Sequence, residues 1–302
     1  MINTPRLENI PPLENSRLIV NRLCDQGRLD TAMEITQAGV EALREETPDD
    51  KDRLYKLVSM LELLGDVQRL SEDLDRARIS YQEALDISKG LEGNAEQVAR
   101  IYTYIAIIYD SAGLPDEAIP FYHYSIKVSE ELSPPPLVSI ADVSNNLASL
   151  AKRIGEYSFA EEHYLKALNI YNDVLGDRDL KGADVINNLG SLYLEIGQMQ
   201  LAEEMYKQSL DIRVASLPDG HRDIGQVSSN LGLALYQLGD KGEALKMFDK
   251  AWSIYSQNVS ETPESYAFVA ENFIMTLKES GDYEKAQIVE AHRLEFLQRD
   301  KK

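Results

Sequence analysis

The chain has 302 residues, of which 43% are hydrophobic and 27% are charged, a balance typical of folded proteins. Its 51 acidic and 31 basic residues give a formal net charge of −20. Because binding to nucleic acid and to anionic lipid depends on lysine and arginine, this charge argues against nucleic-acid partners and against membrane adsorption. No segment approaches the roughly 18 apolar residues that span a bilayer, so we expect no membrane insertion.

The N-terminal residues 1–12 contain Pro5, Pro11 and Pro12 and no apolar signal core, so we expect a flexible start without a secretory peptide. The single cysteine, Cys24, excludes an internal disulfide and fits a reducing compartment. We expect Cys24 to serve as a small buried hydrophobic residue on the first helix. Together these features predict a cytoplasmic protein.

A short pattern recurs along the rest of the chain. It consists of a glycine, an alanine five residues later, an aromatic residue nine residues later, and a small residue followed by a large apolar one. The pattern is anchored near residues 27, 72, 113, 155, 197, 239 and 281, with Glu72 in the glycine slot of the second copy. Steps of about 42 residues predict a solenoid of stacked supersecondary units, and hence one domain over 1–302.

One copy shows what each unit contains. Apolar residues at helical spacing predict a first helix over 143–154 and a second helix over 159–175. Gly155 ends the first helix, since glycine adopts the left-handed conformation without steric cost. The fold predicted is therefore all-α, a right-handed superhelical solenoid of about seven antiparallel helix pairs whose first helices line a concave face. Thr36 and Glu290 replace the aromatic residue in the end copies, and residues 297–302 form a polar tail, as expected where stacking stops.

The repeats resemble tetratricopeptide repeats, specifically the 42-residue type of the kinesin light chain. The matching segments are Asn-Asn-Leu-Ala at 145–148, Asn-Asn-Leu-Gly at 187–190 and Ser-Asn-Leu-Gly at 229–232, together with the connectors at 175–179 and 217–223. No heptad coiled coil precedes the repeats, so a motor-adaptor role does not carry over. The resemblance is specific for fold and weak for function, because such arrays serve many unrelated partners.

The resemblance implies that the second, sixth, ninth and thirteenth positions of each first helix face the concave groove. Four asparagines, 42 residues apart, occupy the sixth position in successive units, and an amide suits the backbone of an extended peptide because it offers both donors and acceptors. The residues expected to bind a peptide are Arg100, Tyr104, Asp142, Asn146, Asp184, Asn188, Asn230 and Asn272. A structural alternative stays open, in which the asparagines bond neighbouring helices and fix the superhelical register, as we expect for Asn145 and Asn187.

The second groove position carries Asp142 and Asp184, where a clamp for an acidic tail would need a base. Like charges repel, so a neutral or basic segment is the expected partner. An alternative is that these acids are simply solvated.

Catalytic signals are weak. His221-Arg222-Asp223 spells a kinase catalytic-loop tripeptide but lacks the glycine-rich loop and strand lysine that accompany it. The four histidines show no metal-ligand spacing, and the sequon at Asn258 has no secretory context. We therefore expect no enzyme activity, no cofactor and no metal.

The function predicted is a protein–protein interaction scaffold or adaptor that binds an extended segment of a partner in its concave groove. One alternative is a structural assembly or oligomerisation module that acts through the convex face or the terminal repeats, with self-association. Another is a regulatory sensor of a small signalling peptide.

Overall fold

The computed structural model describes residues 13–45, 50–257 and 262–299, and side chains from residue 16 to residue 295 within these ranges. The predicted flexible start at 1–12, the sequon at Asn258 and the last residues of the predicted polar tail lie outside the described residues. Within them the chain forms fourteen helices and no strand. Their bounds are α1 Leu13–Asp25, α2 Leu29–Glu45, α3 Lys51–Leu70, α4 Leu74–Ser88, α5 Ala95–Ser111, α6 Pro115–Glu130, α7 Leu137–Arg153, α8 Tyr157–Leu175, α9 Leu180–Glu195, α10 Met199–Ser216, α11 Arg222–Gln237, α12 Lys241–Tyr255, α13 Pro263–Glu279 and α14 Tyr283–Arg299.

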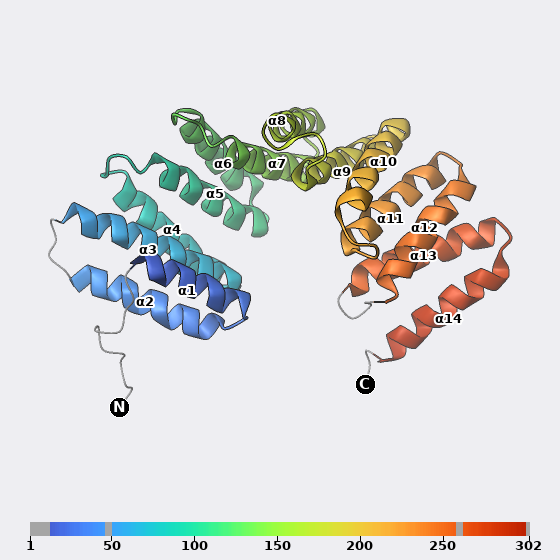
Figure 1. Ribbon diagram of the computed structural model, residues 1–302, viewed down its shortest axis with the longest axis horizontal. Coiled ribbons are helices and arrows are strands. Elements are labelled where there is room, and N and C mark those ends of the chain that lie inside the picture. The colour runs from blue at the N-terminus through green and yellow to red at the C-terminus, as the bar shows by residue number, and fades with distance from the viewer. Residues whose placement is uncertain (1–12, 46–49, 258–261, 300–302) are drawn as a thin grey trace. The chain divides into compact units, whose positions relative to one another are not determined.

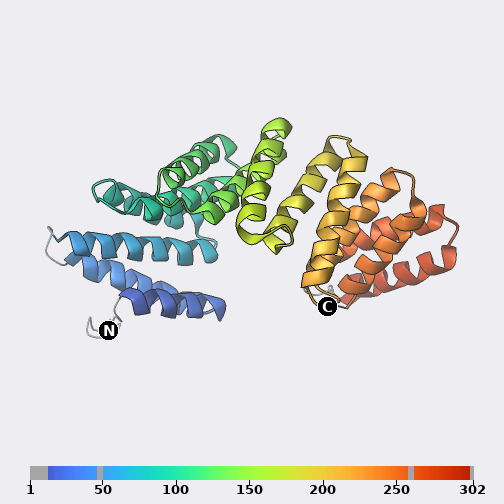
Figure 2. The same cartoon turned by 45° about the horizontal axis from the view of Figure 1, so that its top comes forward.

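Consecutive helices form antiparallel pairs joined by tight turns, which Figures 1 and 2 show from two directions. The turn inside each pair uses the left-handed backbone conformation at the repeat anchor. Gly155 has φ +82°, and Glu72, in the glycine slot of the second copy, has φ +61°. The prediction of an all-α fold with about seven antiparallel helix pairs is thus confirmed for the described residues.

The chain divides into two compact units, Met1–Val143 and Ser144–Lys302, which we call unit 1 and unit 2. The division falls within α7 rather than at the proline-rich connector 133–136, which joins α6 to α7. A single domain over 1–302 stays a prediction.

Inside the five central pairs, an aromatic ring on the second helix packs against a small residue on the first. The rings are almost completely buried, and they are Tyr81, Tyr122, Tyr164, Tyr206 and Phe248. At Gly190 an added Cβ would lie only 2.8 Å from Cδ1 of Tyr206, so the ring fills the space that the glycine leaves. The last pair reverses the sizes, because buried Ile274 stands in register with Gly190 and Glu290 with Tyr206. The repeat pattern therefore records one steric rule, a large side chain against a small one.

Candidate functional site

Unit 1 contains three adjoining cavities lined by its first helices. The first has a volume of about 600 Å³ and is lined from α1, α3 and α5 and from the loop before α5. The second, of about 430 Å³, shares Arg17 and Leu63 with the first. The third, of about 180 Å³, shares Glu96 and Arg100 with the first and Tyr104 with the second. We call these three cavities together the unit 1 groove.

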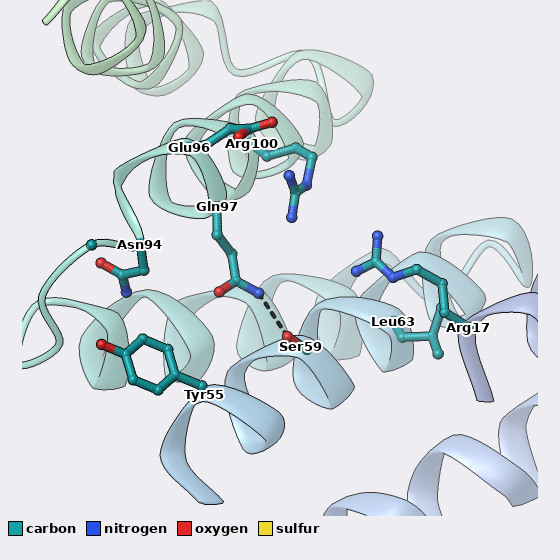
Figure 3. A pocket seen from close by; sticks show the side chains of 9 residues that line it. Arg17, Tyr55, Ser59, Leu63, Asn94, Glu96, Gln97 and Arg100 are labelled. Carbon is teal, nitrogen blue, oxygen red and sulfur yellow. Dashed lines mark hydrogen bonds between the residues drawn. The ribbon is translucent and has the colours of Figure 1, made fainter. Parts of the chain in front are cut away.

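A buried carboxylate organises the floor of the first cavity. Glu62 on α3 has no exposed surface, yet it is charged. Arg100 donates to both of its oxygens, from Nε at 2.5 Å and from Nη2 at 3.1 Å. Arg17 on α1 and Gln97 on α5 each donate a further hydrogen bond of 3.1 Å to Oε2. The network ties three successive first helices together, and Figure 3 shows the guanidinium groups of Arg17 and Arg100 pointing toward one another.

The same network sets the ionisation of Glu62. Burial alone raises the pKa of this carboxyl, but the hydrogen bonds and positive charge of Arg100, with smaller contributions from Gln97 and Arg17, hold it below its ordinary value. The pKa of Arg100 is raised by its hydrogen bonds to Glu62. Glu62 therefore carries a full negative charge at neutral pH, and both arginines stay cationic beside it.

Asp66, Tyr104 and Cys24 line the second cavity, and the buried Tyr81 contacts the first two of them. The hydroxyl of Tyr81 donates to Oδ1 of Asp66 at 2.6 Å, and the rings of Tyr81 and Tyr104 stack with centroids 5.2 Å apart. Burial raises the pKa of Asp66, and the negative charge of Glu62 adds to the shift. Cys24 lines this cavity and is half-buried rather than enclosed in the core, so the expectation of a buried residue is only partly met. Burial raises the pKa of its thiol, so the thiol stays protonated at neutral pH.

Three of the eight predicted site residues line the unit 1 groove. Arg100 borders the first and third cavities, Tyr104 the second and third, and Asp142 the third. Arg100 donates some of its hydrogen bonds to Glu62, so it stabilises the fold and also lines the cavity.

The other five predicted residues lie in unit 2, where the asparagines bond between helices. Nδ2 of Asn188 donates to Oδ1 of Asn145 at 3.1 Å, and Nδ2 of Asn230 donates to Oδ1 of Asn187 at the same distance. These bonds join α7 to α9 and α9 to α11. For Asn188 and Asn230 they support the structural alternative, in which the amides hold the register, while each half-buried side chain keeps further donor and acceptor capacity.

The remaining members of the predicted set differ from one another. Nδ2 of Asn272 donates to the carbonyl of Phe268 on its own helix at 2.8 Å, and Asn146 is half-buried on α7. Asp184 accepts a hydrogen bond of 2.6 Å from Nη2 of Arg213, whose side chain is only 3% exposed. Asp184 therefore neutralises the buried Arg213, and this ion pair reduces the negative charge that a ligand would meet.

Sequence reasoning missed Arg17, Glu62 and Gln97, although a signal was present. Counted back from the repeat anchors, Arg17 and Glu62 occupy the fifth position of their first helices, the same position as Asn145 and Asn187. In all four cases this side chain bonds the first helix of an adjacent pair. Comparing the fifth position of neighbouring repeats would have shown Arg17 and Glu62 as an opposite-charge pair on adjacent first helices.

The kinase-like tripeptide has a structural use. His221 caps the N-terminus of α11 by accepting the backbone N–H of Asp223 at 3.2 Å, and Oδ2 of Asp223 lies 3.7 Å from Nη1 of Arg213. Among the described residues no group of three or more His, Cys, Asp or Glu side chains is placed to hold a metal ion. None of the described helices combines the length and the apolar character needed to cross a membrane.

Known proteins share both the repeats and the fold. A curated TPR repeat-containing protein of Schizosaccharomyces pombe is 29% identical over 120 residues, which are 39% of this chain and a third (33%) of that protein. The crystal structure of BtubC (BKLC) from P. vanneervenii has a TM-score of 0.67 at 29% identity, covering 76% of this chain and 91% of that one.

A Podosopora anserina structure of nearly identical TPR-like repeats, described as a kinesin light chain, has a TM-score of 0.57 at 18% identity and covers 70% of this chain and 98% of that one. This confirms the predicted likeness to kinesin light chain repeats at the level of the fold. The profile of the tetratricopeptide repeat matches residues 56–131, 139–214 and 198–257, which together make up more than half of the chain. The chain therefore belongs to the tetratricopeptide repeat family.

Proposed function

We propose that this protein is a scaffold or adaptor that binds an extended segment of a partner protein in the unit 1 groove. The observation that carries the proposal is the row of three adjoining cavities along successive first helices. Repeat arrays of this kind use such surfaces to bind other proteins. A volume of about 600 Å³ for the first cavity lies within the range of sites that hold a ligand.

The lining suits an extended backbone better than a compact apolar ligand. The first cavity presents the amides of Asn94 and Gln97 and the hydroxyl of Ser59, which already accepts a hydrogen bond of 3.1 Å from Gln97. Gln97 donates both amide N–H groups inside the protein, to Ser59 and Glu62, so it offers its carbonyl oxygen to a peptide N–H. Asn94 donates one N–H to the carbonyl of Ser88 and keeps the other, together with its own carbonyl oxygen, for a peptide backbone. Tyr104 offers the face of an aromatic ring beside them, where an apolar side chain can pack.

The charges that line the third and first cavities favour different residues of a bound segment. The third cavity contains two acids, Glu96 and Asp142, against one base, Arg100, a balance that favours a neutral or basic residue of the bound segment. The first cavity contains two arginines and one acid, Glu96. The proposal also includes the asparagines of unit 2 as a separate contact surface. Asn146 and Asn272 are the members of this surface that take no part in the hydrogen bonds between helices.

Site-specific photo-crosslinking tests the proposal. A photoreactive phenylalanine analogue replaces Gln97 in one variant and Tyr104 in another, and replaces the exposed Ser253 on the second helix α12 in a control. Cross-linked segments are identified by mass spectrometry after irradiation in native lysate, and circular dichroism establishes that each variant keeps its helix content.

We expect the two groove variants to cross-link the same short segment of one partner and the control to miss it. Cross-links shared equally by all three variants would refute a groove site. Cross-links to a second copy of the chain would favour the alternative of self-association. The variant Asn146→Ala/Asn188→Ala/Asn230→Ala, tested in the same way, decides whether unit 2 contributes.

A further inference from the structure

We infer that the third cavity of the unit 1 groove is a pocket for one basic side chain, lysine or arginine, of the bound segment. This inference rests on the proposed function, since it names the side chain that one part of the groove accepts. A charged hydrogen-bond donor, rather than any neutral residue, is what the polar groups of this cavity require.

The third cavity differs from the other two because it reaches a second helix. Besides residues of α5 and α7, it is lined by Ser125 and Ser129 of α6, which are 1% and 4% exposed. The cavity therefore passes between two first helices and ends on the helix behind them. Its volume of about 180 Å³ is below the range of sites that hold a whole small ligand, so it fits a single side chain.

The paired hydroxyls of the cavity can act only as acceptors toward a ligand. Oγ1 of Thr103 donates to the carbonyl of Ala99 at 3.2 Å and lies 2.7 Å from Oγ of Ser125. Because a hydroxyl has one proton, the proton between Thr103 and Ser125 belongs to Ser125. The remaining lone pairs of Ser125 therefore call for a donor on the ligand.

Ser129 provides a second, independent sign of a ligand. It lines the cavity and is almost completely buried, yet its hydroxyl forms no hydrogen bond with any residue that the structure describes. Buried polar groups in native proteins are hydrogen-bonded, and a hydroxyl left without a partner costs free energy. A donor group that enters the cavity would satisfy Ser129 and Ser125 together.

The charges around the cavity favour a cation. Glu96 on α5 and Asp142 on α7 contribute two carboxylates, and Glu96 forms no salt bridge within the described part of the chain. The one base of the lining, Arg100, is already matched by the buried Glu62, to which it donates two hydrogen bonds. With Arg17, which also contacts Glu62, these five groups carry one net negative charge. A single ammonium or guanidinium group neutralises it.

The walls of the cavity suit the aliphatic stem of such a side chain. Ala99, Pro136 and Val143 supply apolar surface. Lysine and arginine bury their stems along apolar surface while the charged head finds polar partners. Both side chains have several N–H donors and no acceptor, which complements a pocket of acceptors. An acidic side chain would instead meet two carboxylates, and an apolar one would leave Ser129 without a partner.

The inference is tested on the whole chain with probes that carry one side chain each. N-acetyl-lysine methylamide and N-acetyl-arginine methylamide carry the positive charge, N-acetyl-norleucine methylamide keeps the stem without the charge, and N-acetyl-glutamate methylamide reverses the charge. Each probe is titrated at constant ionic strength while NMR follows the methyl groups of Ala99, Thr103 and Val143, which line the cavity. The methyl group of Ala251, buried in unit 2, is the internal reference.

Two variants remove one partner each, and a third is the matched control. Ser129→Ala removes the unpaired hydroxyl and Glu96→Gln removes a charge at constant shape. Glu117→Gln removes the charge of an exposed acid on α6 that does not line the cavity.

We expect a saturable shift of the cavity methyl groups with a basic probe and none with the norleucine or glutamate probe. Ser129→Ala should weaken binding about tenfold, because a hydrogen bond to a charged group is lost. Glu96→Gln should weaken it about threefold, since an exposed charge is partly screened, and Glu117→Gln should match the wild type. The tighter of the two basic probes identifies the side chain as lysine or arginine.

The inference is overturned if neither basic probe gives a saturable shift, if the norleucine probe gives the same shift, or if the glutamate probe binds more tightly than both basic probes. Binding that is equally tight in Ser129→Ala, Glu96→Gln and Glu117→Gln would overturn it as well. Should Ser129→Ala lose helix content, the comparison of probes on the wild type still decides the question. Groove cross-links that persist while the basic probes fail would reject this inference and leave the proposed function standing.

Discussion

Removing the positive charge of Arg100 should destabilise unit 1 strongly, because it strips a buried carboxylate of its main partner. In Arg100→Met the hydrophobic stem is kept and the two hydrogen bonds of 2.5 Å and 3.1 Å to Glu62 are lost. Breaking a buried ion pair by removing one partner costs about 3–5 kcal/mol, since the other charge stays buried without compensation. Glu62 retains Arg17 and Gln97, so we expect a loss of about 3 kcal/mol, the lower end of that range.

A double variant separates the ion pair from the packing. Replacing buried ion pairs with apolar residues of similar volume is often neutral or stabilising, so Glu62→Met/Arg100→Met should recover most of the loss. The exposed pair of Arg44 and Glu83 is the matched control, because Nη2 of Arg44 also donates to both carboxylate oxygens, at 2.7 Å and 2.6 Å, but the side chains are 51% and 36% exposed. Arg44→Met should cost no more than about 1 kcal/mol.

The assay is urea unfolding followed by far-ultraviolet circular dichroism, with midpoints and slopes fitted for all three variants and the wild type. The single tryptophan, Trp252, lies in unit 2, so its fluorescence follows that unit separately. The reasoning is refuted if Arg100→Met costs less than Arg44→Met, or if the double variant is less stable than Arg100→Met. Either result would mean that Glu62 does not depend on Arg100 for its charge.

Four further variants test the packing and the ionisation. Asn188→Ala should lose about 0.5–1.5 kcal/mol in urea unfolding, because it removes the bond of 3.1 Å to the preceding first helix, and Asn272→Ala, whose amide bonds only its own helix, should lose less; equal losses would count against the register role. Gly190→Val should cost on the order of 1–3 kcal/mol, since a Cβ at this glycine comes within 2.8 Å of the Tyr206 ring, and a midpoint at or above that of the wild type would show that the ring moves aside freely. Burial raises the pKa of Asp66 in the folded state, so its contribution to stability is present at low pH and is lost as the pH rises from the ordinary value of about 3.9 through the raised pKa. Asp66→Asn should remove this loss of stability. Unfolding midpoints that fall equally with pH in the variant and the wild type would contradict the expectation.

The fold could be predicted because the repeat places the same physical demands on successive helix pairs. Gly155 must adopt a left-handed backbone, and the ring of Tyr206 must meet a residue as small as Gly190. Each demand restricts one position to a few residue types, so the positions recur visibly at steps of about 42 residues. The division into two units within α7 leaves no such mark, since the helix runs through it without a turn residue.

The candidate site was only partly predictable. Its charged side chains pair with residues at positions other than the second, sixth, ninth and thirteenth of the first helices, which were expected to face the groove. Asp184 was expected to repel acidic ligands, but its charge is shared with Arg213, which lies on a second helix. The pairing of two arginines in the first cavity was not predicted for a related reason. Arg17 was not considered, and Arg100 was considered without the carboxylate of Glu62 on the preceding first helix.

The fifth position of the first helices links the two units in one physical argument. In the first two first helices that contribute it to unit 2, α7 and α9, this position carries neutral amides, Asn145 and Asn187, which bond the next first helix and add no charge to the surface. In unit 1 the same position carries Arg17 and Glu62, an ion pair whose cation remains accessible while its anion is buried. The same position therefore joins neighbouring first helices through neutral amides in one part of the chain and through an ion pair with a buried acid in the other.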